Sequence, residues 1–340
     1  MIDSAPIFSK VVAKAATVLR NNDWLVVLAA SWTVPLGLIP AFKVSYFNSL
    51  LFWVVPIGAL LPRFLSLTHG GSRRRRALGW ATAQLGVVGL MLDFVLGHKI
   101  LRFNTMDAKA YVAYLPAIGM MIPVEEVLFY LLGPPALLLV YFWCDEFWLS
   151  RYNRQDLRLA MSSEQYLLRP SWRALLMGAL VVAAGVGLKA WWSQGQVWVP
   201  YYFTYLVLIG FVPAFGAYNA TKELVNWRAL SVTVLYVLAT SIIWEVTLAF
   251  PRRWWGYQPD ALLGVVIESW TVDPAWPFPI EAVLVWLSAP FASVFTYELV
   301  KAYHYHPNRS RIRRLLPIGR LSASTNAQVK APGRNWLPPP

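Results

Sequence analysis

Eight apolar stretches, each long enough to cross a lipid bilayer as a helix, occur along this 340-residue chain. A helix needs about 20 residues to span the hydrocarbon core of a membrane. Within lipid the backbone must satisfy its own hydrogen bonds, so apolar stretches of this length are predicted to be helical. The predicted spans lie near residues 24–42, 46–67, 77–96, 123–143, 172–192, 198–218, 229–250 and 279–303. The sequence therefore predicts an all-α integral membrane protein with about eight transmembrane helices.

The overall composition excludes an ordinary soluble domain. Charged residues make up 14% of the chain, whereas soluble domains hold about 25%. The 18 Trp and 16 Tyr residues are typical of proteins that cross the interfaces between membrane and water. The net charge of +13 comes from basic residues in short loops and in the tail. This distribution indicates contact with membrane lipid and argues against nucleic acid as a partner.

Metal and cofactor sites have no support in the sequence. Cys144 is the one cysteine, and the histidines form no ligand set, so we expect no metal site. A glycine-rich phosphate loop and a nucleotide-binding motif are both absent from the sequence. We therefore expect a function that needs no cofactor.

An internal duplication organises the chain. The segment Pro123-Val124-Glu125-Glu126 recurs 156 residues later as Pro279-Ile280-Glu281-Ala282, and Pro134 and Tyr141 recur at the same offset. Upstream, the tripeptide at 76–78 recurs 152 residues later at 228–230, and Asp93 falls on Glu245. Several matches at nearly one offset indicate two copies of one unit. We predict two four-helix repeats, residues 1–150 and 151–310, followed by a disordered basic and Pro-rich tail, 311–340.

The distribution of Lys and Arg predicts the topology. These residues concentrate in the N-terminal segment, the even-numbered loops and the C-terminal tail, so both termini are expected in the cytoplasm. An even number of helices per repeat inserts both copies the same way up, as in transporters with parallel repeats. The repeated acids should therefore lie toward one leaflet, the outer one. Two shorter apolar segments, 111–122 and 261–270, are expected to lie over them.

Five acids inside the apolar sequence are the candidates for chemistry. An ionisable group at membrane depth costs a few kcal/mol and is a functional hypothesis by default. Burial and a neighbouring carboxylate both favour the protonated form, and a protonated carboxyl beside an ionised one forms an acid–base pair. The alternative is a structural role, in which the acids pair with Arg102, Arg252 and Arg253. Matched acids in both repeats favour the functional interpretation. The candidates are Asp93, Glu125, Glu126, Glu245 and Glu281. We expect Glu125 and Glu126 to be the acid–base pair with Asp93 supporting them, and Glu281 and Glu245 to have the corresponding part in the second repeat.

Aromatic residues lie close to these acids in the sequence. For any single ring, a place in the aromatic belt at the membrane interface is the ordinary explanation. The alternative is a cavity whose ring faces stabilise a carbocation, as terpenoid chemistry requires. The residues expected to line such a cavity and bind substrate are Phe129, Tyr130, Trp255, Tyr257 and Trp286.

The repeated segments resemble the membrane-embedded lycopene cyclases, a family of carotenoid cyclases. In that family a proline, one residue, a glutamate and usually a second acid occur twice, as they do at 123–126 and, with Ala282 at the second acid position, at 279–282. The family also carries an acid on the preceding helix and an aromatic-rich turn, which Asp93, Glu245 and the segment 255–257 resemble. The resemblance covers more than half of the chain.

The resemblance implies an enzyme that cyclises the end group of a polyene without redox change. An acid protonates a terminal double bond of lycopene, the neighbouring double bond attacks the cation, and a base removes a proton to leave an ionone ring. The implied partners are a lipophilic polyene or isoprenoid and other enzymes of carotenoid synthesis. A cyclase for another polyprenoid remains open, as does a transporter or binding protein for a hydrophobic molecule with proton-coupled acids.

Overall fold

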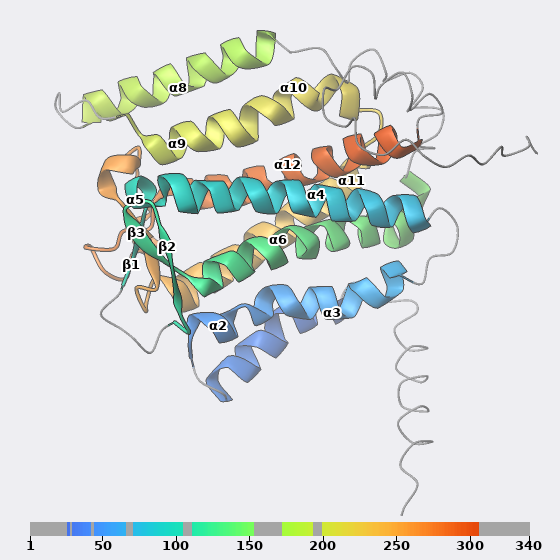
Figure 1. Ribbon diagram of the computed structural model, residues 1–340, viewed down its shortest axis with the longest axis horizontal. Coiled ribbons are helices and arrows are strands. Elements are labelled where there is room, and N and C mark those ends of the chain that lie inside the picture. Colours follow the sequence, from blue (N-terminus) through green and yellow to red (C-terminus); the bar gives the residue numbers. More distant parts are fainter. Residues whose placement is uncertain are drawn as a thin grey trace, which may run out of the picture. The chain divides into compact units, whose positions relative to one another are not determined.

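The computed structural model describes residues 26–27, 29–41, 44–65, 71–104, 111–152, 172–192 and 199–305. The tail predicted at 311–340 lies outside these residues. Most of the described chain is helical (Figure 1), in the segments α2 (Tyr46–Ser49), α3 (Leu51–Leu65), α4 (Gly71–Met91), η1 (Leu92–Leu96), α5 (Gly97–Ile100), α6 (Val124–Trp143), η2 (Cys144–Trp148), η3 (Ser150–Tyr152), α8 (Trp172–Trp192), α9 (Tyr201–Tyr205), η4 (Leu206–Phe211), α10 (Val212–Thr221), α11 (Trp227–Trp244), η5 (Glu245–Ala249), η6 (Pro259–Ala261), η7 (Glu268–Trp270) and α12 (Ile280–Tyr305). Four short strands complete it: β1 (Leu101–Phe103), β2 (Tyr114–Ala117), β3 (Met120–Pro123) and β4 (Trp255–Tyr257).

Seven of the described helices are long and apolar enough to cross a membrane, which indicates an integral, multi-pass membrane protein. They are Tyr46–Leu65, Arg74–Ile100, Val124–Trp148, Trp172–Trp192, Tyr201–Thr221, Trp227–Ala249 and Ile280–Ala302. The stretch predicted as the first span appears as a shorter apolar helix, Ala29–Ala41. Part of that predicted span, including Trp24 and Leu28, lies outside the described residues.

Capping residues and a proline mark where several of these helices begin. Ser45 caps α2 by accepting a hydrogen bond from the N–H of Asn48, at 3.2 Å, and Asn226 caps α11 in the same way. Pro123 precedes α6 in an extended conformation, so the helix begins directly after it. As a result, Glu125 and Glu126 lie in the first turn of α6, and Glu281 lies in the first turn of α12.

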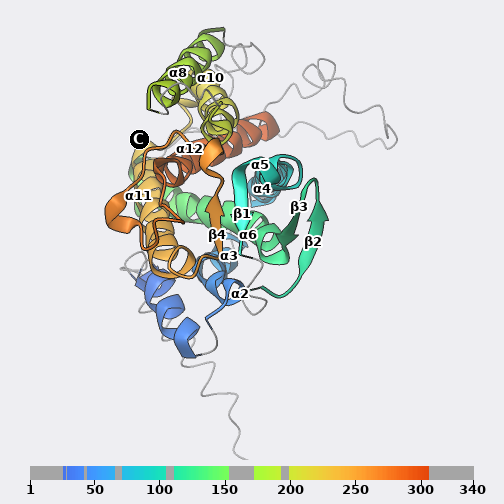
Figure 2. The same cartoon turned by 90° about the vertical axis from the view of Figure 1, so that its left-hand side faces the viewer.

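The helices α6 and α12 form the centre of the bundle. Helix α6 packs against α3, α4 and α11, whereas α12 packs against α10, α11 and α4 (Figures 1 and 2). By position in the two halves of the chain, α3 corresponds to α10, α4 to α11 and α6 to α12. Each of the three contacts of α6 therefore has a counterpart among the three contacts of α12.

The strands show that corresponding helices point the same way. Strand β1, which follows α5, pairs antiparallel with β4, which follows η5, so the C-terminal ends of α4 and α11 lie at one end of the bundle. Phe103 lies opposite Trp255 in this pairing, and these two residues are also 152 positions apart. The starts of α6 and α12 lie at the same end, because Ile118 donates to the carbonyl of Phe94 and Ile280 donates to that of Val265. We call this the acid end of the bundle.

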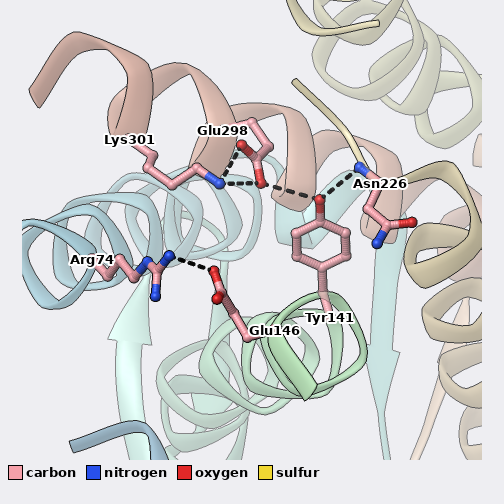
Figure 3. A network of polar contacts seen from close by, with 6 residues as sticks. All are labelled: Arg74, Tyr141, Glu146, Asn226, Glu298 and Lys301. Carbon is pink, nitrogen blue, oxygen red and sulfur yellow. Dashed lines mark hydrogen bonds and ion pairs between the residues drawn. The ribbon is translucent and has the colours of Figure 1, made fainter. Parts of the chain in front are cut away.

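A buried polar network joins the helices toward their opposite end (Figure 3). Lys301 forms an ion pair with Glu298, at 2.7 Å, within α12. The hydroxyl of Tyr141 on α6 donates to the same Glu298 carboxylate at 3.1 Å and accepts the N–H of Asn226 at 3.2 Å. Arg74 at the start of α4 pairs with Glu146 in η2, at 2.8 Å. These contacts fix the helix ends that lie far from the five candidate acids.

Candidate functional site

A cavity of about 520 Å³ lies among the central helices and reaches the acid end. This volume falls within the range of about 300–1,000 Å³ that is usual for small-molecule sites. Its walls come from helices of both halves of the chain, from α2 to α12, and from the strands β1 and β4. Two carboxylates and many aromatic rings line it, and the rings near the acid end are Tyr46, Trp53, Phe129, Tyr130, Tyr202, Tyr205, Trp244, Trp255, Tyr257 and Trp286.

Glu126 is one of the two carboxylates on the cavity wall. It lies in the first turn of α6 and is 7% exposed. One carboxylate oxygen accepts a hydrogen bond from the hydroxyl of Tyr46 at 2.9 Å. The ring of Tyr46 is itself held against Trp255, with the ring centroids 4.8 Å apart. The orphan N–H groups at a helix start favour an anion, so this position suits an ionised carboxylate.

Glu245 is the second carboxylate on the wall and comes from the other half of the chain. It is the first residue of the π-helix η5 and accepts a hydrogen bond from the indole N–H of Trp286 at 2.9 Å. Its second oxygen has no hydrogen-bond partner among the described residues. The charges of Glu245 and Glu126 interact. Single-turn π-helices occur often at functional sites.

Asp93 lies behind the cavity wall, in the matching π-helix η1. The hydroxyl of Tyr130 donates to it at 3.1 Å, and its charge interacts with that of Glu126. Tyr130 approaches α4 closely because Gly89 has no side chain: a Cβ there would lie 2.1 Å from the tyrosine ring. The acid–aromatic contact is the same in both halves, since Asp93 corresponds to Glu245 and Tyr130 corresponds to Trp286 at offsets of 152 and 156.

Glu125 and Glu281 have a different position. Neither is among the residues that line the cavity. Glu125 accepts the backbone N–H of Val112 at 2.6 Å, and Glu281 accepts that of Leu263 at 2.5 Å. The two carboxylates therefore hold the segments at 111–122 and 261–270 over the acid end, as the sequence suggested. The first of these segments is a β-hairpin, β2–β3, because it pairs with itself in antiparallel register.

The arginines proposed as structural partners bind elsewhere. Arg102 donates to the carbonyl of Ala275 and lies over the ring of Trp276, at 4.1 Å from its centroid. Arg253 pairs with Asp273 at 2.6 Å, and Arg252 donates to the carbonyl of Thr247 at 3.0 Å. In the described part of the chain, none of the five candidate acids forms an ion pair with these arginines. Ion pairing with them therefore does not explain why the acids are buried.

All five aromatic residues expected from the sequence line the cavity: Phe129, Tyr130, Trp255, Tyr257 and Trp286. Six further rings that line the cavity were not singled out: Tyr46, Trp53, Tyr202, Tyr205, Trp244 and Phe295. Trp53 stacks on Trp286, with centroids 5.6 Å apart, and Trp244 lies 5.4 Å from Phe129. Trp244 directly precedes Glu245 in the sequence, and this position next to a candidate acid could have identified it as a lining residue.

The second half has no counterpart of the Glu126 carboxylate. At the matching position it has Ala282, which is fully buried and is not among the residues that line the cavity. Tyr202, in the first turn of α9, stacks on Tyr257, with the ring centroids 4.9 Å apart. Burial raises the pKa of Tyr257 well above its ordinary value, so its hydroxyl keeps its proton. The second half thus contributes one carboxylate, Glu245, and the neutral rings of Tyr202 and Tyr257 to the wall.

Known proteins provide no further guide to this site. A comparison with protein-family models, curated proteins and solved structures finds no match to the chain. The arrangement of the side chains is therefore the basis for assigning a function. It places two carboxylates, one from each half of the chain, on the aromatic wall of an apolar cavity inside a membrane protein.

Proposed function

We propose that this protein cyclises the end group of a lycopene-type polyene by acid–base chemistry inside the bilayer. The observation that supports this proposal most directly is the pair Glu126 and Glu245 on one aromatic-lined apolar cavity. A carbocation intermediate needs a proton donor, a proton acceptor and ring faces that stabilise positive charge. The cavity supplies all three.

Glu245 is assigned as the acid and Glu126 as the base. Glu245 lies toward the C-terminal end of the helix formed by α11 and η5, where the helix dipole disfavours an anion. Glu126 lies at a helix start and accepts from Tyr46, and both features favour the carboxylate. Glu245 protonates the terminal double bond, and the neighbouring double bond attacks the resulting tertiary cation. Glu126 then removes a proton from the new ring, so the reaction consumes no net proton and no oxidant.

Asp93 is assigned a supporting role. Its charge acts on Glu126, and its hydrogen bond positions the ring of Tyr130 at the cavity wall. Glu125 and Glu281 are assigned to the cover at the acid end, since each binds a backbone N–H of a covering segment. The rings of Phe129, Trp244 and Trp286 surround the position proposed for the cation.

The proposal includes the finer architecture. The chain comprises two parallel repeats, residues 1–150 and 151–310, with the helix Ala29–Ala41 belonging to an eighth span. Both termini are cytoplasmic, which places the acid end in the outer leaflet. The matched acid–aromatic contacts and the antiparallel pairing of β1 with β4 support the duplication.

Substitution of the acids in cells that produce lycopene tests this proposal. Glu126→Gln and Glu245→Gln should each lower conversion to cyclic carotenoids by about 10²–10⁴-fold, the usual contribution of a general acid or base. The matched control is Glu125→Gln, because glutamine can still accept the N–H of Val112. Pigments are separated by chromatography at equal protein level.

Full conversion by Glu245→Gln would contradict the assignment. Polyene uptake without cyclisation by the unaltered protein would favour a transporter or binding protein.

A further inference from the structure

The cavity is elongated along the helices and extends well beyond the acids. On α12 its lining runs from Trp286 to Leu299, which corresponds to about 20 Å at a rise of about 1.5 Å per residue. Small side chains form much of this inner part: Gly133, Gly210, Ala214, Ala217, Ser288, Ala289, Ala292 and Ser293. A long, narrow and apolar space of this kind fits an extended hydrocarbon chain, with its reactive end beside the carboxylates.

One wall of this cavity reaches the outer surface of the bundle. Val88 on α4 and Ile209 in η4 both line the cavity, yet their side chains are 37% and 43% exposed. Gln84, one turn before Val88, also lines the cavity and is exposed. A polar side chain near the middle of a span is costly when it faces hydrocarbon. These three residues therefore mark an opening between α4 and η4–α10, which we call the lateral opening.

The corresponding place in the other half of the chain is closed. At the offset of 152, Gln84 corresponds to Tyr236 and Val88 to Thr240. The helix Ala29–Ala41 covers both positions: the ring of Trp32 stacks on Tyr236, and its indole N–H donates to Thr240 at 2.8 Å. The helix that holds the matching place in the second repeat is α8. It packs against α9, η4 and α10, on the far side of α10 from α4 (Figures 1 and 2).

We infer that the lateral opening is the site through which a polyene chain enters the cavity from the lipid. The inference rests on the proposed function for the chemical class of the ligand. Toward the acid end the opening is bounded by Tyr205, whose hydroxyl donates to the carbonyl of Val88 at 3.1 Å. Toward the opposite end it is bounded by Gln84. The displaced position of α8 leaves this side open to lipid, whereas Trp32 closes the equivalent side.

Narrowing the opening tests the inference by a readout separate from catalysis. The double variant Val88→Phe/Ile209→Phe places two larger rings at the opening. Its matched control is Val87→Phe/Leu208→Phe, because both residues are exposed on the same elements, at 56% and 49%, and neither lines the cavity. Lycopene is delivered from lipid vesicles to the purified protein, and quenching of tryptophan fluorescence reports its entry. Thermal melting of both variants confirms that each is folded.

The expected result is entry about tenfold slower in the double variant than in the control, because an obstructed path lowers the association rate. Equal rates in the two variants, with cyclisation intact, would overturn the lateral opening alone. Slower entry in the double variant, without cyclised product from any protein, would uphold the opening and overturn the proposed enzyme activity. If lycopene does not quench the tryptophan fluorescence of the unaltered protein, polyenes are not its ligand, and the inference is then wrong as well.

Discussion

At the scale of single residues, the indole of Trp286 has two separable roles. Its ring forms part of the cavity wall, and its N–H donates to Glu245 at 2.9 Å. Trp286→Phe keeps an aromatic ring but removes the donor. A hydrogen bond to a carboxyl group contributes about 1.5–3 kcal/mol when that group is charged. During turnover Glu245 becomes an anion, so we expect the substitution to slow cyclisation by about tenfold or more, measured as the initial rate of product formation.

The chain offers a control on the same stack of rings. Trp53 lies parallel to Trp286, and its indole N–H has no partner among the described residues. Trp53→Phe therefore removes a similar amount of ring and no hydrogen bond. If both substitutions slow the reaction equally, ring area rather than the N–H of Trp286 is what matters.

The sequence identified which residues gather at the acid end, but it did not identify the role that we propose for each of them. Five acids and five rings were expected at one site, and the structure brings all ten to one end of the bundle. Glu125 and Glu126 are adjacent and point about 100° apart on a helix, so they need not both face one cavity. Which of them faces it depends on how α6 is rotated against α3 and α4. That rotation is a property of packing and is not encoded in the spacing of the acids.

At the scale of elements, close packing between α4 and α6 positions Tyr130. Gly89→Ala should displace this ring, because the added Cβ would lie 2.1 Å from it. We expect a loss of stability of about 1–3 kcal/mol, typical of overpacking, together with slower cyclisation through the lost contact with Asp93. The change in melting temperature and the initial rate measure the two effects.

A second glycine of the same helix provides the control. An added Cβ at Gly79 would meet nothing within 4 Å, so Gly79→Ala should stabilise α4 by a fraction of a kcal/mol through helix propensity. A stabilising effect of Gly89→Ala as well would show that Tyr130 moves aside without cost.

The elements show what sequence patterns can and cannot predict. The hydrophobic stretches predicted seven of the described spans within a few residues, because lipid imposes helix on any long apolar segment. The π-helices at Asp93 and Glu245 were not predicted, since widening a helix by one residue per turn leaves the hydrophobic pattern almost unchanged. The hairpin β2–β3 was also not predicted. The length of a short apolar segment does not distinguish a strand from a helix.

At the scale of the whole described molecule, the two halves of the chain contact each other through several elements. Helix α4 packs against α12, α6 packs against α11, and β1 pairs with β4. We therefore expect fragments 1–160 and 161–340, expressed together, to assemble and recover cyclisation, whereas either fragment alone should be inactive. Co-purification through a tag on one fragment measures assembly. Recovery of activity by the first fragment alone would show that Glu245 is not required.

The sequence predicted the duplication but not the departure from symmetry that opens the bundle on one side. Repeated motifs report what the two halves share, such as the tripeptides at 76–78 and 228–230. The different covering of α4 and α11 depends on Trp32 in one half and on the position of α8 in the other. A hydrophobic pattern predicts that a segment is a helix, but it does not predict on which side of a neighbouring helix that segment packs.

The direction of the cavity has a consequence for the order of products. Its long axis runs along the helices, and the proposed reactive pair lies at one end only, since Glu126 and Glu245 are both at the acid end. A symmetric polyene bound there exposes one terminus to chemistry in each encounter. To react at its other terminus, the molecule must leave, reverse its orientation across the bilayer and bind again. Under the proposed function, a doubly cyclised pigment therefore results from two independent binding events. The pigment with a single ring is then an obligatory, freely diffusing intermediate whose abundance depends on the density of the protein in the membrane.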